Sequence, residues 1–312
     1  MTTPQAFHAV NRFGLGAKPG ELEKAASNPR KYVLDQLEAP IVINETLLEA
    51  SKTHGTYAAE DAARRTNPKN RELIGETRRA SRERYNLAIA ERMRHGIQTD
   101  LPVIERLVYF WSNHFTVSTM KQRIHPLVNI YEVNALRRRV TGKFADMLLA
   151  VERHPAMLVY LDNYLSAGPN SPYAINRKKG MNENLAREIL ELHTLGVKGG
   201  YTHQDIVALA KIISGWTLEL RDDPRRHIAR FYFDPKMHEP GEKILLGKRY
   251  GEGEEAGKQA LLDLAKRPAT ARFIATKLVR HYVTDNPPQE LIQEVIKTYL
   301  ETDGDISGMM RT

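Results

Sequence analysis

The sequence predicts an all-α fold, a multi-helix globular protein with one small β-hairpin near residues 229–247. Two observations support this class. Apolar residues recur at helical spacing through most of the 312 residues. Alternation of apolar and polar residues, which is typical of half-buried strands, is found in "RFYFDPKMHEPGEKILLG". At this length, one large domain and two closely packed halves are both allowed.

The first hundred residues predict polar helices at the periphery of the molecule. Residues 20–38 indicate two short helices interrupted at Pro29, and residues 45–65 and 70–95 indicate helices with thin apolar stripes. Arginines and lysines are concentrated here with glutamates between them, which is the pattern of a solvated helix with i, i+4 ion pairs. We therefore interpret residues 1–99 as a basic, peripheral helical part.

The helical core is predicted for residues 100–312. The stretch "DLPVIERLVYFWSNHF" indicates a buried helix, with Asp100 as N-cap, Pro102 in the first turn and apolar residues on most of its circumference. Helices over 126–139 and 142–152 follow, and then the apolar run "HPAMLVYLDN". We expect this core and the peripheral part to form one continuous domain.

A loop of about twenty residues, 164–181, precedes the second half of the core. It is rich in Gly, Pro, Asn and Ser, and long loops inside compact domains are usually functional or disordered. Further on, Thr202 with Asp205 predicts a capping box that opens a buried helix reaching Trp216. The chain is expected to finish with helices over 254–266, 268–285 and 288–300.

Composition narrows the classes of function. The chain has no cysteine, which excludes disulfides, thiolate nucleophiles and thiolate metal sites, so a metal would need His, Asp or Glu. The net charge of +8 keeps open the binding of a polyanion by the arginine-rich stretch 64–84. Nucleic acid is not an expected partner, because no zinc finger, basic-aromatic pattern or zipper heptad is found.

The sequence carries no membrane span, because no run of about eighteen apolar residues occurs. Its opening, "MTTPQAFHAVNRFGLG", lacks the pattern of a signal peptide, which predicts a cytoplasmic location for the chain as given. Motifs for nucleotide phosphates, zinc proteases, serine hydrolases and kinases are absent.

The stretch "NENLAREILELHTLG", residues 182–196, is the strongest candidate site. At 100° per residue, one helix face carries four polar residues, Asn184, Arg187, Glu188 and Glu191. The opposite side carries Leu185, Ile189, Leu192 and His193. Because Glu188 has Leu192 rather than a cation at i+4, we expect the polar face to line a cleft. Its two carboxylates could hold a divalent ion or act as acid and base; alternatively, Arg187 and a distant cation neutralise them in a structural network.

Three histidines are candidate metal ligands. His114 is expected to point into the core, and His193 lies on an apolar side, where a histidine is commonly a satisfied core residue. His238 is expected at a hairpin tip beside Glu239 and Lys243. Convergence of the three on one of the two glutamates would make a site of the histidine-and-carboxylate kind.

Several segments resemble, in order, a bacterial family described as domain of unknown function 1800 (DUF1800). They are "HAVNRFGLGAKPGELE", "FWSNHFTVS", "HPAMLVYLDN", "NENLAREILELHTLGVKGGYTHQDIVALAKIISGWTL", "MHEPGEKILLG" and "RPATARFIATKLVRHYVTDNPP". The resemblance covers nearly the whole chain and implies a mainly helical domain. It also implies a genomically associated alkaline-phosphatase-like partner, and periplasmic or exported location, because family members often carry an export signal. Members usually continue past "ETDGDISGMMRT", so the chain is expected to be truncated at its C-terminus.

The resemblance carries over onto individual positions. In the hairpin, the family tends to show His-Asp where this chain has His238 and Glu239. The matching motif residues are Asn113, His114, Asp162, Asn163, Asn182, Asn184, Arg187, Glu188, Glu191, His193, Trp216, His238 and Lys243.

Two main hypotheses of function follow. In the first, the protein is an enzyme that performs acid–base or metal-assisted chemistry on a polar or anionic substrate. Glu188 or Glu191 would be the base or a ligand, Asn184, Arg187 and Lys243 would bind substrate, and loop 164–181 would act as a lid. In the second, it is a non-catalytic partner or maturation protein for an exported alkaline-phosphatase-like protein, and the polar network is purely structural. Polyanion binding is the third possibility.

Overall fold

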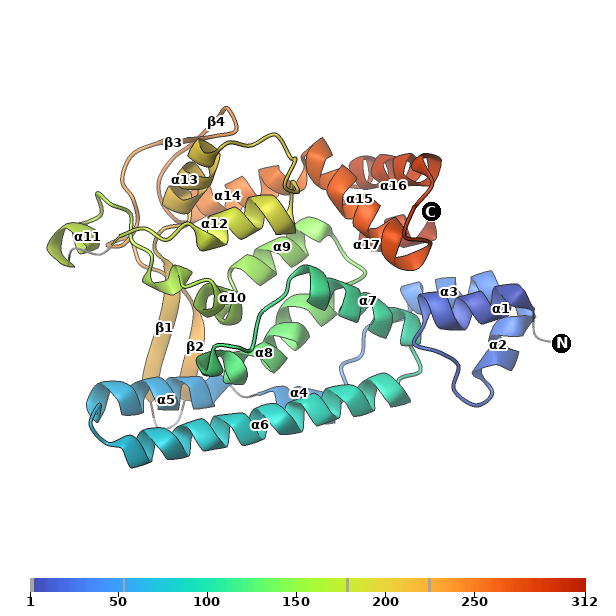
Figure 1. The fold of residues 1–312 in the computed structure, drawn as a ribbon, viewed down its shortest axis with the longest axis horizontal. Helices are drawn as coiled ribbons and strands as arrows, with labels where there is room; N and C mark the ends of the chain where they lie inside the picture. The colour runs from blue at the N-terminus through green and yellow to red at the C-terminus, as the bar shows by residue number, and fades with distance from the viewer. Residues whose placement is uncertain (1–2, 53, 178–179, 224–225) are drawn as a thin grey trace.

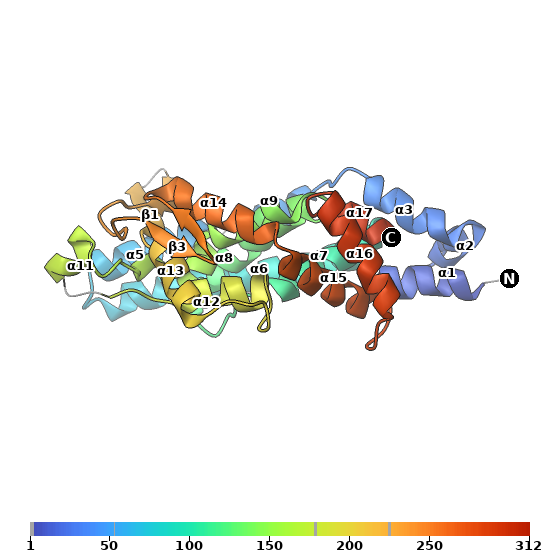
Figure 2. The same cartoon turned by 90° about the horizontal axis from the view of Figure 1, so that it is seen from above.

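The computed structural model describes residues 3–52, 54–177, 180–223 and 226–312. It confirms the mainly helical class, with small antiparallel sheets as the β-structure of this part of the chain. The body is elongated: helix α6 (Arg71–Gln98) runs along one long edge, and the later helices lie along the opposite edge (Figure 1). Seen from above, the same helices form a flattened slab (Figure 2).

The N-terminal helices begin where local signals place them. They are α1 (Pro4–His8), the π-helical turn η1 (Ala9–Phe13), α2 (Glu21–Ser27), α3 (Pro29–Glu38), α4 (Glu45–Ser51) and α5 (His54–Thr66). The predicted interruption at Pro29 is confirmed: Pro29 opens α3, and the Asn28 side chain caps it by accepting the Lys31 N–H at 2.9 Å. Helix α6 continues to Gln98, three residues beyond the prediction.

Helix α7 (Pro102–His114) is the buried helix that the apolar stretch predicts. Its N-cap differs from the prediction, because Leu101 rather than Asp100 occupies that position and no side chain caps the helix. The Thr99 hydroxyl instead accepts the Leu101 N–H at 3.1 Å. The core around α7 is aromatic, with the Trp111 ring stacked on Phe115 at 5.9 Å. Full burial of such a side chain contributes about 2–3 kcal/mol to the free energy of unfolding.

The helices after α7 complete the core. Helix α8 (His125–Tyr131) runs into a π-helical turn, η3 (Glu132–Leu136), and a 3₁₀ turn, η4 (Arg137–Arg139). Helices α9 (Phe144–Glu152) and α10 (Pro155–Tyr160) follow. The remaining helical elements are η2 (Gln122–Ile124), η5 (Asn163–Leu165), α11 (Pro172–Arg177), α12 (Asn184–Glu188), η6 (Ile189–His193), α13 (His203–Ile212), α14 (Glu254–Ala265), α15 (Pro268–Tyr282), α16 (Gln289–Glu301) and α17 (Ile306–Arg311).

The strands pair differently from the predicted hairpin. Strand β2 (Arg226–Phe233) pairs with the upstream strand β1 (Trp216–Asp223), and β3 (Lys243–Leu245) pairs with the downstream strand β4 (Lys248–Tyr250). The two strands within residues 229–247, β2 and β3, therefore do not pair with each other in the described structure. The downstream turn is made by Leu246 and Gly247, both with positive φ (49° and 81°), which is the geometry of a tight two-residue hairpin.

The predicted capping box is confirmed at the start of α13. The Thr202 hydroxyl accepts the Asp205 N–H at 3.3 Å, and an Asp205 carboxylate oxygen accepts the Thr202 N–H at 2.8 Å. The other Asp205 oxygen accepts the Leu246 N–H at 2.7 Å, so this residue also fixes the β3–β4 turn. Among the described residues, no helix is both long and apolar enough to cross a membrane.

Candidate functional site

The polar face predicted on "NENLAREILELHTLG" is an ion-pair ladder on α12 and η6. Arg187 lies between Glu183, 3.4 Å away, and Glu191, 3.3 Å away. The Arg187 side chain is 42% exposed and that of Glu191 is 27% exposed, so the ladder faces solvent on one side. Asn184 is exposed as well, and its backbone N–H donates to the Asn182 side chain at 2.8 Å. Glu188 is partly exposed and makes no ion pair with any residue described.

A π-helical turn changes which side chains of this stretch are buried. Ideal α-helical geometry, at 100° per residue, predicts that Leu192 and His193 lie on the same apolar side. In the structure Leu192 is 46% exposed, whereas His193 is 3% exposed. The cause is η6 (Ile189–His193), whose wider turn rotates the following residues relative to an ideal α-helix. The assignment of Leu192 to the buried side was therefore wrong.

His193 is held against a carboxylate in the core. Its Nδ1 atom lies 2.8 Å from Oε1 of Glu152, the last residue of α9, which is completely buried. The two atoms are at ion-pair distance but not in hydrogen-bond alignment, so the contact is mainly electrostatic. A buried carboxylate is costly unless it is paired, and His193 supplies that pairing.

His114 connects this pair to a lysine. The Nε2 atom of His114 lies 3.1 Å from the backbone oxygen of His193, and its Nδ1 atom lies 2.8 Å from Nζ of Lys277 on α15. A carbonyl oxygen only accepts hydrogen bonds, so Nε2 carries the hydrogen and Nδ1 accepts from Lys277. We call His114, Glu152, His193 and Lys277 the imidazole–lysine cluster.

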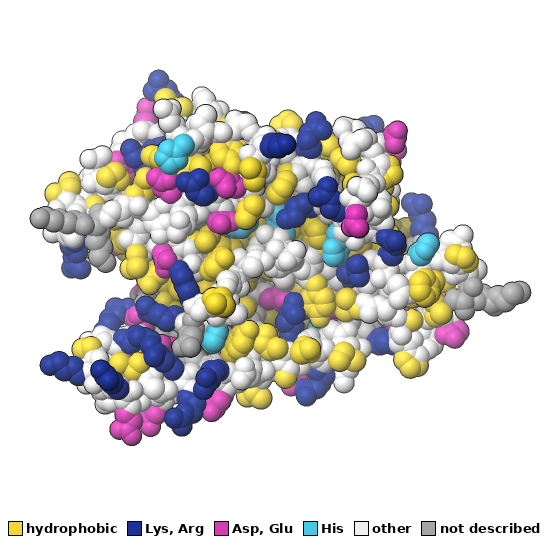
Figure 3. Space-filling model, viewed as in Figure 1, with side chains coloured by type: hydrophobic (Ala, Val, Ile, Leu, Met, Phe, Trp, Pro, Cys, Tyr) yellow, Lys and Arg dark blue, Asp and Glu magenta, His cyan; other side chains and the backbone are white. Residues whose placement is uncertain are grey.

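The surroundings of His114 and Lys277 disfavour a positive charge on these two groups. Burial, with the nearby charges of Lys277 and His193, holds the pKa of His114 well below its usual value. Burial also lowers the pKa of Lys277. The lysine is only partly buried, whereas His114 is 4% exposed. Histidine side chains and Lys or Arg side chains appear together near the middle of the face drawn in Figure 3, between the α12 and α15 sides.

His238 belongs to a different cluster. Its Nδ1 atom donates to the backbone oxygen of Ser214 at 2.9 Å, while Nε2 accepts from the Gly253 N–H at 3.1 Å and lies 3.2 Å from Nζ of Lys243. Both His238 and Lys243 are buried, and His238 lies between β2 and β3, which do not pair, rather than at the expected hairpin tip. Burial is the main cause that lowers the pKa of each side chain.

Glu239 attaches the loop before α12 to this second cluster. Its carboxylate accepts the Asn170 backbone N–H at 2.9 Å and the Asn170 side-chain amide at 2.7 Å. Gly168 packs so closely that an added Cβ would lie 2.5 Å from the Glu239 Cα. The described part of loop 164–181 is therefore docked on the segment around Glu239 and contains the short helix α11. Residues 178–179 of this loop lie outside the described residues.

The three candidate histidines do not converge on one point. His114 and His193 meet in the imidazole–lysine cluster, with ring centroids 6.2 Å apart, and His238 lies with Lys243. Both ring nitrogens of His114 are already engaged by protein groups. Within the described ranges, no three or more His, Asp or Glu side chains are grouped so that they could hold a metal ion.

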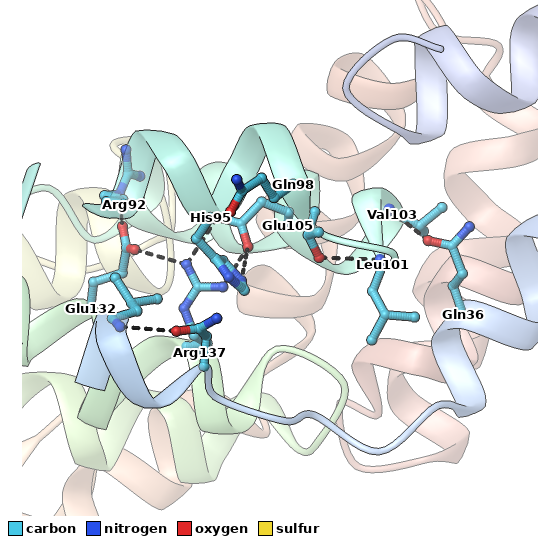
Figure 4. Close-up of polar contacts among 12 residues, drawn as sticks. Gln36, Arg92, His95, Gln98, Leu101, Val103, Glu105, Glu132 and Arg137 are labelled. Atoms are coloured by element: carbon cyan, nitrogen blue, oxygen red, sulfur yellow. Dashed lines mark hydrogen bonds and ion pairs between the residues drawn. The ribbon is translucent and has the colours of Figure 1, made fainter. Parts of the chain in front are cut away.

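A third buried network was not predicted from the sequence. Arg137 donates to Glu105 through both terminal nitrogens, one of them at 2.9 Å, and to Glu132 at 3.1 Å (Figure 4). From α6, Arg92 lies 2.6 Å from Glu132 and His95 lies 3.4 Å from Glu105. Burial alone would raise the pKa of Glu105, but the hydrogen bonds from Arg137 and His95 outweigh it and lower the pKa to about 2. The network joins α6 to the core.

Comparison with known proteins identifies a family. The profile described as "Protein of unknown function (DUF1800)" matches residues 8–312. The chain belongs to this family. No curated protein and no solved structure matches it. In the structure, most of the DUF1800 motif residues named from the sequence lie in three places: the α12–η6 ladder, the imidazole–lysine cluster and the His238 cluster. Glu152 and Lys277 are additions that only the structure provides.

Proposed function

We propose that this DUF1800 protein is an enzyme that transfers protons to or from a polar or anionic substrate, and that Lys277, oriented by His114, is its acid–base group. The observation that carries the proposal is the 2.8 Å contact between Lys277 Nζ and His114 Nδ1, with one partner buried and the other partly exposed. A titratable pair with perturbed pKa values at the edge of a core is typical of catalytic sites.

The cluster supports this chemistry in a definite way. A lowered pKa increases the fraction of Lys277 that is a neutral amine near pH 7, and only the neutral amine can accept a proton. His114 Nδ1 accepts one N–H of the lysine, which orients the amine. The backbone oxygen of His193 fixes the His114 tautomer, and Glu152 holds the His193 ring. In this scheme His114, His193 and Glu152 are positioning residues.

The roles assigned from the sequence to Glu188, Glu191, Arg187, Lys243 and Asn184 stay predictions. Arg187 is already paired with two carboxylates, and Lys243 is buried against His238. Neither is as available for a substrate anion as an unpaired surface cation. Glu188 is the member of this set that keeps a partly exposed carboxylate without an ion pair among the described residues. It is therefore the best candidate among them for substrate contact.

The test is a titration of lysine reactivity. The full chain is labelled with trinitrobenzenesulfonate over a range of pH, and peptide mass spectrometry gives the midpoint at each lysine. We expect the midpoint of Lys277 to lie below that of Lys297, whose side chain is 74% exposed. A panel of ester, amide and phosphate-ester substrates is then compared between the parent and Lys277→Met, with Lys297→Met as control. An ordinary midpoint, or an activity that survives Lys277→Met, contradicts the proposal.

The second candidate is a non-catalytic partner for an exported alkaline-phosphatase-like protein. The bonding of Arg137 and His238 to other protein groups supports the structural part of this candidate, in which the polar network holds the fold together. Stable association with a purified protein of that class, equal for the parent and Lys277→Met, supports this candidate. Metal-assisted chemistry also remains a proposal, tested by elemental analysis of the purified protein.

A further inference from the structure

An open pocket of about 630 Å³ lies where η4, α9 and β2 meet, and its volume is in the range of small-molecule sites. Four cationic side chains line it, Arg138, Arg139, Lys143 and Arg153. Asp146 is the carboxylate among the lining residues, and Leu149 and Phe231 contribute apolar surface. The pocket shares no residue with the imidazole–lysine cluster, so its function is independent of the acid–base proposal.

The run of three arginines, Arg137 to Arg139, divides between the core and this pocket. Arg137 turns inward to Glu105 and Glu132. Arg138 is exposed and makes no hydrogen bond or ion pair with any residue that the structure describes. Arg139 donates to the backbone oxygens of Asn134 and Ala135, which carry no negative charge. Neither Arg138 nor Arg139 therefore has a carboxylate ion pair among the described residues, although Asp146 also lines the pocket.

The other cations of the pocket are compensated. Lys143 lies 3.4 Å from Asp305, and Arg153 pairs with Glu254. The Arg153 guanidinium lies 4.1 Å from the centroid of the Phe231 ring. Phe231 and Leu149 contribute apolar surface to the lining of the pocket. Burial, opposed in part by Asp146 and assisted by Arg138, lowers the pKa of Arg139.

We propose that this pocket binds a small organic phosphate, with the phosphate on Arg138 and Arg139 and the apolar group against Leu149 and Phe231. The guanidinium fork matches the oxygen spacing of a phosphate, and two arginines without a carboxylate ion pair among the described residues supply charge-assisted donors. The adjoining apolar surface favours an aryl or alkyl monoester over free phosphate.

Isothermal titration calorimetry on the full chain tests the proposal with three probes: phenyl phosphate, inorganic phosphate and benzyl alcohol. We expect saturable binding of phenyl phosphate, weaker binding of inorganic phosphate and none of benzyl alcohol. The double variant Arg138→Gln, Arg139→Gln should weaken binding of phenyl phosphate about tenfold or more. The matched control Arg249→Gln, Lys297→Gln removes two charges from exposed ion pairs elsewhere and should bind like the parent.

A single variant keeps the test decisive if loss of the Arg139 backbone contacts unfolds the double variant. Arg138→Gln removes an exposed side chain that holds nothing in the described structure, and we expect it to weaken binding severalfold while the thermal transition stays unchanged. Absence of saturable binding in the parent overturns the proposal, as does equal affinity in parent and Arg138→Gln. Equal affinity for phenyl phosphate and inorganic phosphate overturns the apolar half of the site.

Discussion

His114 Nδ1 lies 2.8 Å from Lys277 Nζ, although 163 residues separate the two in the chain. Because the pKa of His114 is held well below its usual 6.5, the folded protein keeps this imidazole neutral where the unfolded chain protonates it. The unfolded state then binds more protons, so the free energy of unfolding falls as pH drops below about 6.5. His238 and His281, whose pKa values burial also lowers, act in the same direction.

We therefore expect urea unfolding at pH 7.5, 6.5 and 5.5 to show decreasing stability. His114→Gln should flatten this dependence, by at most about 1.4 kcal/mol per pH unit, besides lowering stability at every pH. His203→Gln, at a side chain that is 67% exposed, is the control for removal of a histidine from the surface. A slope in His114→Gln as steep as in the parent would show that His114 is protonated in the fold.

Arg137→Met should be strongly destabilising. It leaves two buried carboxylates, Glu105 and Glu132, without the guanidinium that binds both. Breaking a buried ion pair from one side costs about 3–5 kcal/mol. Chemical denaturation measures the loss, and Lys31→Met, which breaks an exposed pair with Asp35 at 2.8 Å, should have a much smaller effect, because solvent screens that pair. Similar small effects for both variants would mean that the network contributes little.

The same network makes the protein sensitive to acid. The folded pKa of Glu105 is about 2, below the ordinary 4.5, so the folded state resists protonation that the unfolded chain accepts. This stability is present above about pH 4.5 and is lost as pH falls toward 2, about 3 kcal/mol in total. Glu105→Gln should remove this acid-limb dependence in thermal unfolding between pH 5 and 3. Persistence of the dependence in the variant would assign it to other carboxylates.

Because Asp205 contacts both the start of α13 and the β3–β4 turn, its loss should destabilise the protein more than the loss of Thr202. Thr202→Ala removes one side of the capping box and should cost about 1 kcal/mol. Asp205→Ala should cost more, because it also frees the Leu246 N–H in the β3–β4 turn. Urea unfolding of the two variants gives the order, and a larger loss for Thr202→Ala would contradict it.

Local signals predicted much of the fold. Pro29 ends one helix and opens the next, and Thr202 with Asp205 caps α13, because each signal acts through neighbours in the chain. The strand pairing could not be predicted in this way. From the sequence, the strand that ends at Phe233 could pair with the strand before it or with the one after it. The turn at Leu246 has no sequence signal either, because leucine rarely adopts a positive φ.

The candidate site was predicted only in part, because its residues come from segments that lie far apart in the chain. His114 and His193 were identified, but their partners Lys277 and Glu152 come from distant helices, and helix periodicity contains no information about such pairs. One sequence signal does point to the buried network of Glu105. A glutamate inside a strongly apolar helix, as Glu105 is in "DLPVIERLVYFW", indicates a buried cation elsewhere, which here is Arg137.

Glu188 and Glu191, the two candidate catalytic glutamates, should respond to substitution differently from the buried Glu152. Glu188→Gln and Glu191→Gln change partly exposed side chains, and the Glu191 ion pair with Arg187 is 3.3 Å long on a half-exposed face. We expect each variant to lose about 0.5 kcal/mol or less of unfolding free energy. Glu152→Gln should lose several times more, because it leaves buried His193 without its carboxylate.

Comparison of the three variants by urea unfolding, together with the substrate panel, then distinguishes catalysis from packing. An activity lost in Glu188→Gln at unchanged stability would place Glu188 at the substrate, because a folded protein without that carboxylate has lost chemistry rather than structure. If Glu188→Gln instead lost as much stability as Glu152→Gln, its carboxylate would belong to a structural network, and the enzyme proposal would depend on Lys277 alone.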